Sequence, residues 1–467
     1  MPETPASPPP AEIVAQLDRA TKVRLLSGAA TFDTEGLPAF GLEPVGLADG
    51  PHGLRRQASG GDHLGLRGSQ PATCFPTASA LGSSWDVDLL HEVGVALGEE
   101  ALAQGVAVVL GPGFNIKRHP AGGRSFEYLS EDPLLSGKLA AAMVRGVQSQ
   151  GVGTSVKHFA VNNQESHRLV VDAVVDERTL REVYLTAFEI AVRESSPWTV
   201  MCSYNLVNGV YASEHHDLLT TILRDEWGFD GLVVSDYMAI NQLRDYHKLA
   251  RDKADAARMA LEAGMDVELP SIDAYGQDLI DAVKAGAIDE ALIDRSVRRV
   301  LAMKFAFGLF ERPYVDPQAV AAVFDTPDQR ALAREIAQKS MVLLKNDGDL
   351  LPLPKRLSSI AVIGPNADST RNLLGDYSYP AHIETLITLR GLGFSEHPLP
   401  ESIKLVEDYA DMISVLAAIR QAVAPETEVR YAQGCAVNSA DTDGFAAAVD
   451  AAQQADVAIV VVGDKAG

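Results

Sequence analysis

Between about residue 40 and residue 310, short apolar runs alternate with longer segments in which apolar residues recur at helical spacing. The runs that we expect to form strands are 45–47, 107–110, 154–156, 199–202, 232–234 and 265–267. The amphipathic segments that we expect to form helices are 86–104, 176–194, 254–262 and 290–307. Repetition of a strand followed by a helix over this length predicts a parallel α/β fold.

Polar residues follow nearly every expected strand at its carboxyl end. In chain order they are Asp49, Asn115, Lys157 with His158, Tyr204, Asp236 and Glu268. An open doubly wound sheet concentrates its site at one switch point between strands, whereas a barrel gathers the carboxyl ends of all its strands around one mouth. Contributions from six strands therefore favour a (β/α)8-like barrel over an open sheet.

The pattern changes after residue 312. Residues 313–345 are interrupted by prolines and predict a linker and a helix. The first residues, 1–15, are rich in proline and predict a disordered tail. We therefore expect a TIM-barrel-like domain over 16–312 and an α/β sandwich domain over 346–467.

The expected sandwich domain begins with the buried-strand pattern 359–364, which runs into a turn at 365–368. It continues through a helix expected at 407–423 to an apolar strand at 457–462. Because a sheet domain seldom ends where a central strand has just emerged, we also expect the C-terminal part of this domain to be missing.

Charge narrows the class of partner. Asp and Glu number 63 against 40 Lys and Arg, which gives a formal net charge of −23 at pH 7. Such a surface repels nucleic acid and anionic lipid, so we expect neither a nucleic acid nor a membrane partner. No run approaches the roughly 20 apolar residues that cross a bilayer, and the first residues lack the basic and apolar parts of a secretion signal. We therefore expect a cytoplasmic protein that acts on a neutral small molecule.

The leading chemical candidate is Asp236, which follows the apolar run 232–234. An isolated Ser-Asp pair more often caps a helix, and Ser235 with Asp236 precedes a plausible one. A retaining glycosidase, however, needs a carboxylate that stays ionised and attacks the anomeric carbon of a sugar. A strand end in a barrel mouth holds such a group rigidly, and nearby cations would keep its pKa low.

Candidate cations occur in two segments, which contribute Arg124 and the group Lys157, His158 and Arg168. Fork-shaped arginine and charged lysine or histidine donors match the neighbouring hydroxyls of a sugar. Each cation alone could be a surface charge, but a lysine directly after a buried strand needs a partner. Asp49 lies in an Asp-Gly-Pro sequence, which by itself predicts only a turn. Three further acids are expected to organise their own loop rather than to contact a ligand: Glu127, Glu131 and Asp132.

Five motifs occur along the chain in a fixed order. They are Asp-Gly-Pro-His-Gly-Leu-Arg at 49–55, Gly-Arg-Ser-Phe-Glu-Tyr-Leu-Ser-Glu-Asp-Pro at 123–133, Lys-His-Phe at 157–159, Met-Cys-Ser-Tyr-Asn at 201–205 and Gly-Phe-Asp-Gly-Leu-Val-Val-Ser-Asp at 228–236. This ordered set resembles glycoside hydrolase family 3, and the resemblance spans about residues 20 to 467. It implies a barrel-like domain followed by an α/β sandwich, with the site where the two domains meet.

By position within the motifs, the resemblance implies that Asp236 is the nucleophile. The residues that it implies to hold the sugar are Asp49, Arg124, Lys157, His158 and Arg168. Tyr204 matches a tyrosine that lies near the nucleophile. The family usually has tryptophan directly after the nucleophile, where this chain has Tyr237, which still offers an aromatic wall to the substrate.

The acid/base group of β-glucosidase-like members is a glutamate of the second domain, beyond the strand that resembles 457–462. No glutamate of this chain can be assigned that role, so we expect it beyond residue 467. A subgroup that acts on N-acetylglucosaminides instead uses a histidine in a glycine- and proline-containing loop after the Lys-His pair. Here that loop is Ala-Val-Asn-Asn-Gln-Glu-Ser-His-Arg, with His167. This loop fits the glucosidase subgroup better.

We therefore expect a retaining, exo-acting β-glycosidase, in the first place a β-glucosidase, whose substrate is a small-molecule or oligosaccharide β-glycoside. A β-xylosidase shares every motif, and the chain could alternatively be a sugar-binding fragment with little turnover because its acid/base glutamate is absent. A nucleotide-binding protein is excluded because residues 363–366 lack the glycine fingerprint. Two carboxylates suffice for glycoside hydrolysis, so no cofactor or metal is expected. The aglycone and the oligomeric state remain open.

Overall fold

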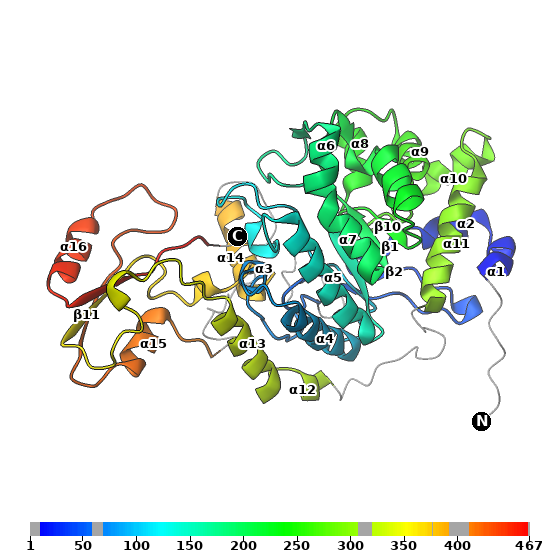
Figure 1. The fold of residues 1–467 in the computed structure, drawn as a ribbon. Coiled ribbons are helices and arrows are strands. Elements are labelled where there is room, and N and C mark those ends of the chain that lie inside the picture. The colour runs from blue at the N-terminus through cyan, green and yellow to red at the C-terminus, as the bar shows by residue number, and fades with distance from the viewer. Residues whose placement is uncertain (1–9, 58–68, 307–319, 376, 392–410, 466–467) are drawn as a thin grey trace, which may run out of the picture. The chain divides into compact units, whose positions relative to one another are not determined.

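The computed structural model describes residues 10–57, 69–306, 320–375, 377–391 and 411–465 (Figure 1). The chain divides into two units, Met1–Ser340 and Met341–Gly467. Residues 313–319 of the expected linker lie outside the described residues. The helices that follow them, α12 (Val320–Val323) and α13 (Pro327–Lys339), belong to the first unit.

The first unit is built around a parallel sheet. Its order is β3 (Leu47–Ala48), β4 (Val108–Val109), β5 (Gly153–Phe159), β7 (Thr199–Cys202) and β10 (Leu232–Val234). Every residue of these strands is buried, as expected for a parallel sheet covered on both faces. Five of the apolar runs in the sequence therefore form strands.

Further bridges close this sheet into a barrel. Beyond β10 they are Val234–Val267, Glu268–Ser27 and Asp33–Gly46. The second leads into the antiparallel hairpin of β1 (Gly28–Ala30) and β2 (Asp33–Thr34), and the third returns to the residue before β3. The expected barrel is present, but a hairpin replaces the strand–helix repeat in one part of its wall. The expected strand at 265–267 contributes single bridges rather than a continuous ladder.

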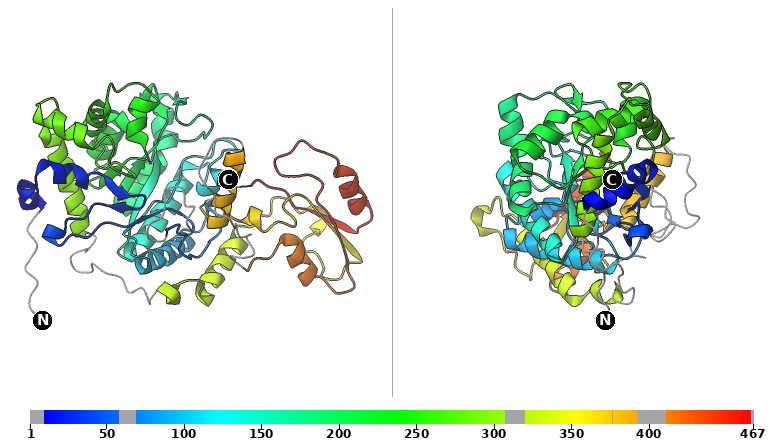
Figure 2. Two further views of the ribbon diagram at one scale, coloured as in Figure 1. Left: turned by 180° about the vertical axis from the view of Figure 1, so that it is seen from behind. Right: turned by 90° about the vertical axis from the view of Figure 1, so that its right-hand side faces the viewer.

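The long helices of this unit mostly begin at a residue whose side chain caps the first turn. They are α4 (Val87–Ala103), α5 (Pro133–Ser149), the continuous run of α6 (Glu177–Thr179), η3 (Leu180–Leu185) and α7 (Thr186–Ser195), α9 (Lys253–Ala263) and α11 (Glu290–Ala306). The side chains of Asp86, Asp132, Asp176 and Asp252 accept a backbone N–H in the first turn of α4, α5, α6 and α9. Such a cap contributes about 1 kcal/mol. α4, α5 and α7 pack in a row (Figures 1 and 2).

Shorter elements complete the first unit. They are α2 (Arg19–Leu25), α3 (Ala78–Ser83), the π-helical η5 (Asp217–Glu226), α8 (Ala239–Asp245) and α10 (Gln277–Lys284), with a small sheet of β6 (Asp172–Ala173), β8 (Leu206–Val207) and β9 (Val210–Tyr211). In neither unit is a described helix long and apolar enough to cross a membrane.

The prediction of a disordered tail over 1–15 is wrong for its last part. Residues 1–9 lie outside the described residues, but Pro10–Gln16 form α1, which packs against α11. The side chains of Ile13 and Val14 are 0% and 3% exposed. Proline fits the first turn of a helix, so the proline-rich composition does not prevent this helix from forming.

The second unit has a parallel sheet with the order β12 (Glu428–Ala432), β11 (Ser359–Ile363) and β13 (Val457–Val460). Its helices are α14 (Tyr379–Gly391), α15 (Val415–Ala422) and α16 (Phe445–Gln453). The expected strands 359–364 and 457–462 are confirmed. The helix expected at 407–423 begins only after Ser414, whose side chain caps it, and residues 407–410 lie outside the described residues.

Candidate active site

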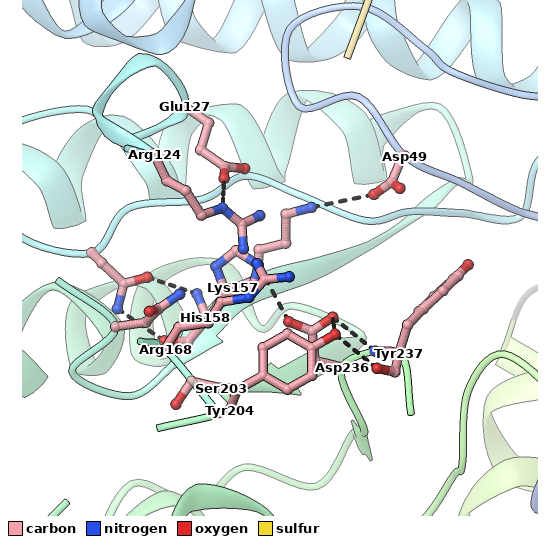
Figure 3. Close-up of polar contacts among 12 residues, drawn as sticks. Asp49, Arg124, Glu127, Lys157, His158, Arg168, Ser203, Tyr204, Asp236 and Tyr237 are labelled. Atoms are coloured by element: carbon pink, nitrogen blue, oxygen red, sulfur yellow. Dashed lines mark hydrogen bonds and ion pairs between the residues drawn. The ribbon is translucent and has the colours of Figure 1, made fainter. Parts of the chain in front are cut away.

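The carboxyl ends of the barrel strands bring the expected site residues together (Figure 3). Asp49 follows β3, Lys157 and His158 lie in β5, Tyr204 follows β7, and Asp236 follows β10. Arg124 lies on the long connection after β4, and Arg168 lies on the loop after β5. All seven side chains lie in one cluster in Figure 3.

The two carboxylate oxygens of Asp236 have different surroundings. Oδ1 accepts a hydrogen bond from the Tyr204 hydroxyl at 2.9 Å and another from the backbone N–H of Tyr237 at 2.7 Å. Oδ2 is buried and accepts no hydrogen bond within the described part of the chain. The nearest cation-forming group recorded at Oδ2 is Nε2 of His158, at 3.8 Å. One oxygen is therefore fixed by two donors, and the other is not.

Burial decides the pKa of Asp236. The side chain is buried, and this desolvation raises the pKa above its ordinary value. Arg124, Arg168, the backbone N–H of Tyr237 and Lys157 act in the opposite direction. The low pKa expected from the neighbouring cations is wrong, because the burial of the carboxylate, which the sequence does not show, outweighs them.

His158 is held as a neutral side chain. Its backbone N–H donates to Oδ1 of Asn115 at 2.8 Å, and Nδ2 of Asn115 donates to the His158 carbonyl at 2.9 Å. Burial first, and then the charges of Arg124, Lys157 and Arg168, lower the pKa of the imidazole well below its usual value. His158 therefore serves as a neutral hydrogen-bonding group and not as the charged donor that the sequence suggested.

Each of the three cations of the cluster has a carboxylate partner. Nζ of Lys157 lies 3.3 Å from Oδ1 of Asp49, and Arg168 contacts Glu165 at 2.5 Å. Arg124 forms an ion pair with the fully buried Glu127. The expectation that Glu127 organises its own loop agrees with this contact, because the pair lies within one turn of chain. The carboxylates orient the cations and leave the mouth of the barrel lined with donors.

Two tyrosines flank the nucleophile candidate. The hydroxyl of Tyr204 is 2.9 Å from Asp236 and 2.7 Å from the Tyr237 carbonyl, and burial raises the pKa of this phenol well above its ordinary value. It is therefore a permanent neutral donor. The hydroxyl of Tyr237 donates to the Thr31 carbonyl in the β1–β2 hairpin, and its ring lies 6.3 Å from that of Phe32. The ring is fixed against the hairpin wall.

Sequence reasoning did not assign roles to several residues that hold this site. Asn115 was noted only as a polar residue after a strand, and its clamp on His158 joins positions 43 residues apart. Glu165 was not singled out, although it lies three residues before Arg168 and could have been found as a carboxylate at ion-pair spacing. Ser203 donates to the Ala160 carbonyl at 3.0 Å and ties β7 to the residue after β5.

Models of two domains of one protein family match the two parts of this chain. The sequence model of the glycosyl hydrolase family 3 N-terminal domain matches residues 58–303, and that of the family 3 C-terminal domain matches residues 341–467. The thermostable β-glucosidase B of Acetivibrio thermocellus is 45% identical over 354 residues, which are 76% of this chain and 44% of that protein.

A second relative is named for a different glycosidase activity. The exo-α-(1→6)-L-arabinopyranosidase of Bifidobacterium longum is 43% identical over 376 residues, or 78% of this chain and 47% of that protein. The chain thus spans about half the length of these curated relatives. Among solved structures, β-glucosidase 3B of Thermotoga neapolitana in complex with α-D-glucose is 32% identical with a TM-score of 0.71, covering 98% of this chain and 63% of that one.

Proposed function

The chain belongs to glycosyl hydrolase family 3, and we propose that it hydrolyses terminal β-D-glucosides by a retaining mechanism with Asp236 as the nucleophile. The observation that carries the proposal is the asymmetry of this carboxylate. Oδ1 is fixed by two donors and Oδ2 accepts no hydrogen bond among the described residues. A nucleophile needs this arrangement, because its reacting oxygen must be free and its approach must be fixed.

In the proposed first step, Oδ2 of Asp236 attacks the anomeric carbon and forms an ester bond while the bond to the aglycone oxygen breaks. The leaving oxygen takes a proton from a general acid. In the second step, water adds to the anomeric carbon, the ester bond breaks, and the water proton passes to the conjugate base. Tyr204 holds Oδ1 throughout, so the carboxylate does not rotate between the steps.

The other carboxylates of the cluster are poorly suited to act as the general acid. Asp49, Glu127 and Glu165 each bind a cation, namely Lys157, Arg124 and Arg168. A proton donor has to face the leaving group, whereas these three side chains face cations. We therefore assign Asp49 and the cations to the recognition of sugar hydroxyls, and Glu127 and Glu165 to holding Arg124 and Arg168 in place.

Azide rescue tests the assignment of the nucleophile. Asp236→Gly should lower the rate on a dinitrophenyl β-glucoside, which needs little acid catalysis, by at least about a thousandfold. Added azide should restore turnover and yield α-glucosyl azide, because it enters from the face that the carboxylate has left. Turnover that survives in Asp236→Gly without azide, or a β-configured azide product, would contradict the proposal.

A pentopyranosidase is the second candidate. It is favoured by the arabinopyranosidase relative at 43% identity and by Tyr237, which replaces the tryptophan usual after the nucleophile. Relative kcat/KM values for aryl β-D-glucoside, aryl β-D-xyloside and aryl α-L-arabinopyranoside separate the two. A β-glucosidase should favour the glucoside, whereas a preference for either pentopyranoside would assign the site to a sugar without the exocyclic hydroxymethyl group.

A further inference from the structure

The loop that carries Arg168 is held mainly by its own contacts. The guanidinium of Arg168 pairs with Glu165, and its backbone N–H donates to the Glu165 carbonyl at 3.2 Å. The N–H of Val170 donates to His167, also within the loop. The guanidinium carbon of Arg168 lies 4.8 Å from the centre of the Tyr204 ring. The bonds to Glu165 and His167 are local, whereas the Tyr204 contact reaches a residue that follows the neighbouring strand β7.

A side chain from outside the loop also forms a hydrogen bond with its backbone. Nε2 of His247 lies 2.7 Å from the carbonyl of Leu169, the residue next to Arg168. Throughout the described ranges, this is the one hydrogen bond that joins residues 164–170 to another element. A carbonyl only accepts, so Nε2 carries the proton. Burial lowers the pKa of His247 to about 4, which keeps the ring neutral in this tautomer near pH 7.

The ring of His247 is itself fixed in place. It stacks on Tyr211 of β9 with ring centroids 3.4 Å apart and an interplanar angle of 5°. Its backbone N–H donates to the Gln242 carbonyl of α8 at 2.8 Å. α8 begins at Ala239, three residues after Asp236. His247 therefore connects the segment that follows the nucleophile with the loop that presents Arg168.

We propose that His247 is a positioning residue that fixes Arg168 for sugar binding. This inference rests on the proposed function, in which Arg168 binds a hydroxyl of the sugar. A guanidinium on a loop that moves by about 1 Å loses the geometry of its hydrogen bonds, and a hydrogen bond to the backbone beside it prevents this movement. His247 connects α8 with the loop through two hydrogen bonds. Its backbone N–H donates to α8, and its Nε2 donates to the loop.

Hydrogen–deuterium exchange tests the anchoring without any glycoside. His247→Phe keeps a ring that can stack on Tyr211 but lacks the donor. His91→Phe, a partly buried histidine on α4, is the matched control. Exchange over residues 164–171 should become faster in His247→Phe and stay unchanged in His91→Phe, with both variants folded by circular dichroism. Unchanged exchange in His247→Phe would overturn the anchoring role, whether or not the protein turns over a glucoside.

A double-mutant cycle tests the consequence for the sugar. His247→Phe should raise KM for an aryl glucoside by about 3- to 30-fold with little change in kcat, a part of the roughly 10- to 100-fold cost expected for Arg168→Ala. The double variant should resemble Arg168→Ala within about twofold, because His247 acts through Arg168. Losses that multiply in the double variant would show that His247 acts elsewhere and would overturn the proposal. His247→Gln, which can donate again, should recover part of the loss.

Discussion

At the scale of single residues, the main feature of the site is that the two carboxylate oxygens of Asp236 differ. One is held by hydrogen bonds and the other is not. Tyr204 and the Tyr237 N–H hold Oδ1 of Asp236, while burial raises the pKa of the same group. The raised pKa makes the carboxylate more basic and therefore a stronger nucleophile once ionised. The donors at Oδ1 and the neighbouring cations oppose this effect and keep the ionised form accessible.

Tyr204→Phe should move the acid limb of the pH profile upward. The phenol bonds the charged form of Asp236, so its loss should raise the pKa of that carboxylate further. The measurement is kcat/KM against pH on an activated aryl glucoside. Tyr184→Phe is the matched control, because this tyrosine is 7% exposed and its hydroxyl bonds Arg118 rather than Asp236. An acid limb that does not move would show that the hydroxyl does not stabilise the ionised nucleophile.

The residues of the site were more predictable than their states. Asp236 and Lys157 could be found because each lies near the end of a buried strand, where a charged side chain needs a partner. The neutral form of His158 and the raised pKa of Asp236 depend on burial by several loops, which no local pattern reports. Asn115 and His247 bond residues far away in sequence, so their roles required the fold.

At the scale of elements, the parallel strands were predictable and the closure of the barrel was not. The residues of β5 and β7 are buried on both faces, which is typical of a covered parallel sheet. The hairpin of β1 and β2 has strands of three and two residues, with the sequences Gly-Ala-Ala and Asp-Thr. Such short strands show no periodicity, so their place in the wall is set by their partners.

The last helix of the barrel unit carries a buried lysine at its end. Lys304 of α11 is 1% exposed, and its Nζ donates to the carbonyls of Glu35 at 2.8 Å and Glu43 at 3.3 Å. These contacts attach α11 to the segment between β2 and β3. Burial lowers the pKa of Lys304 to about 8, against about 10.4 in an unfolded chain.

This pKa difference gives a prediction for stability. Between pH 8 and about 10.4 the unfolded chain binds more protons at Lys304 than the folded one, so this residue makes the protein more stable as the pH rises. The gain is about 3 kcal/mol across that window. Urea unfolding at pH 8 and pH 10 should show this rise in the wild type, and Lys304→Met should lack it. Equal pH dependence of the two proteins would contradict the assignment.

At the scale of the whole molecule, the net charge of −23 and several buried acids act in the same direction. Self-repulsion increases as the remaining acids ionise. Burial raises the pKa of Glu100 to about 7 and that of Glu268 to about 7. Glu100 accepts hydrogen bonds from the Thr73 N–H at 3.1 Å and from Gln329 at 2.8 Å, which connects α4 with α13.

The first unit should therefore be more stable near pH 5 than at pH 8. Both glutamates have folded pKa values above the unfolded value of about 4.3, so their contribution is present at low pH and is lost as the pH rises through about 7. Each contributes about 3 kcal/mol to this difference. Urea midpoints at the two pH values measure it, and Glu100→Gln should reduce the difference. A wild-type midpoint that is higher at pH 8 would contradict this account.

The central claim is that Asp236 forms a covalent bond to the sugar. The most direct test is incubation with 2-deoxy-2-fluoro-β-D-glucosyl fluoride, followed by intact mass measurement and peptide mapping. The fluoride leaves without a proton, so the trap reports on the nucleophile alone, and Asp236→Asn serves as the folded control. We predict one sugar on the peptide that contains Asp236 and none on the variant. A folded wild-type chain that stays unlabelled, or a label on another carboxylate, would contradict the account.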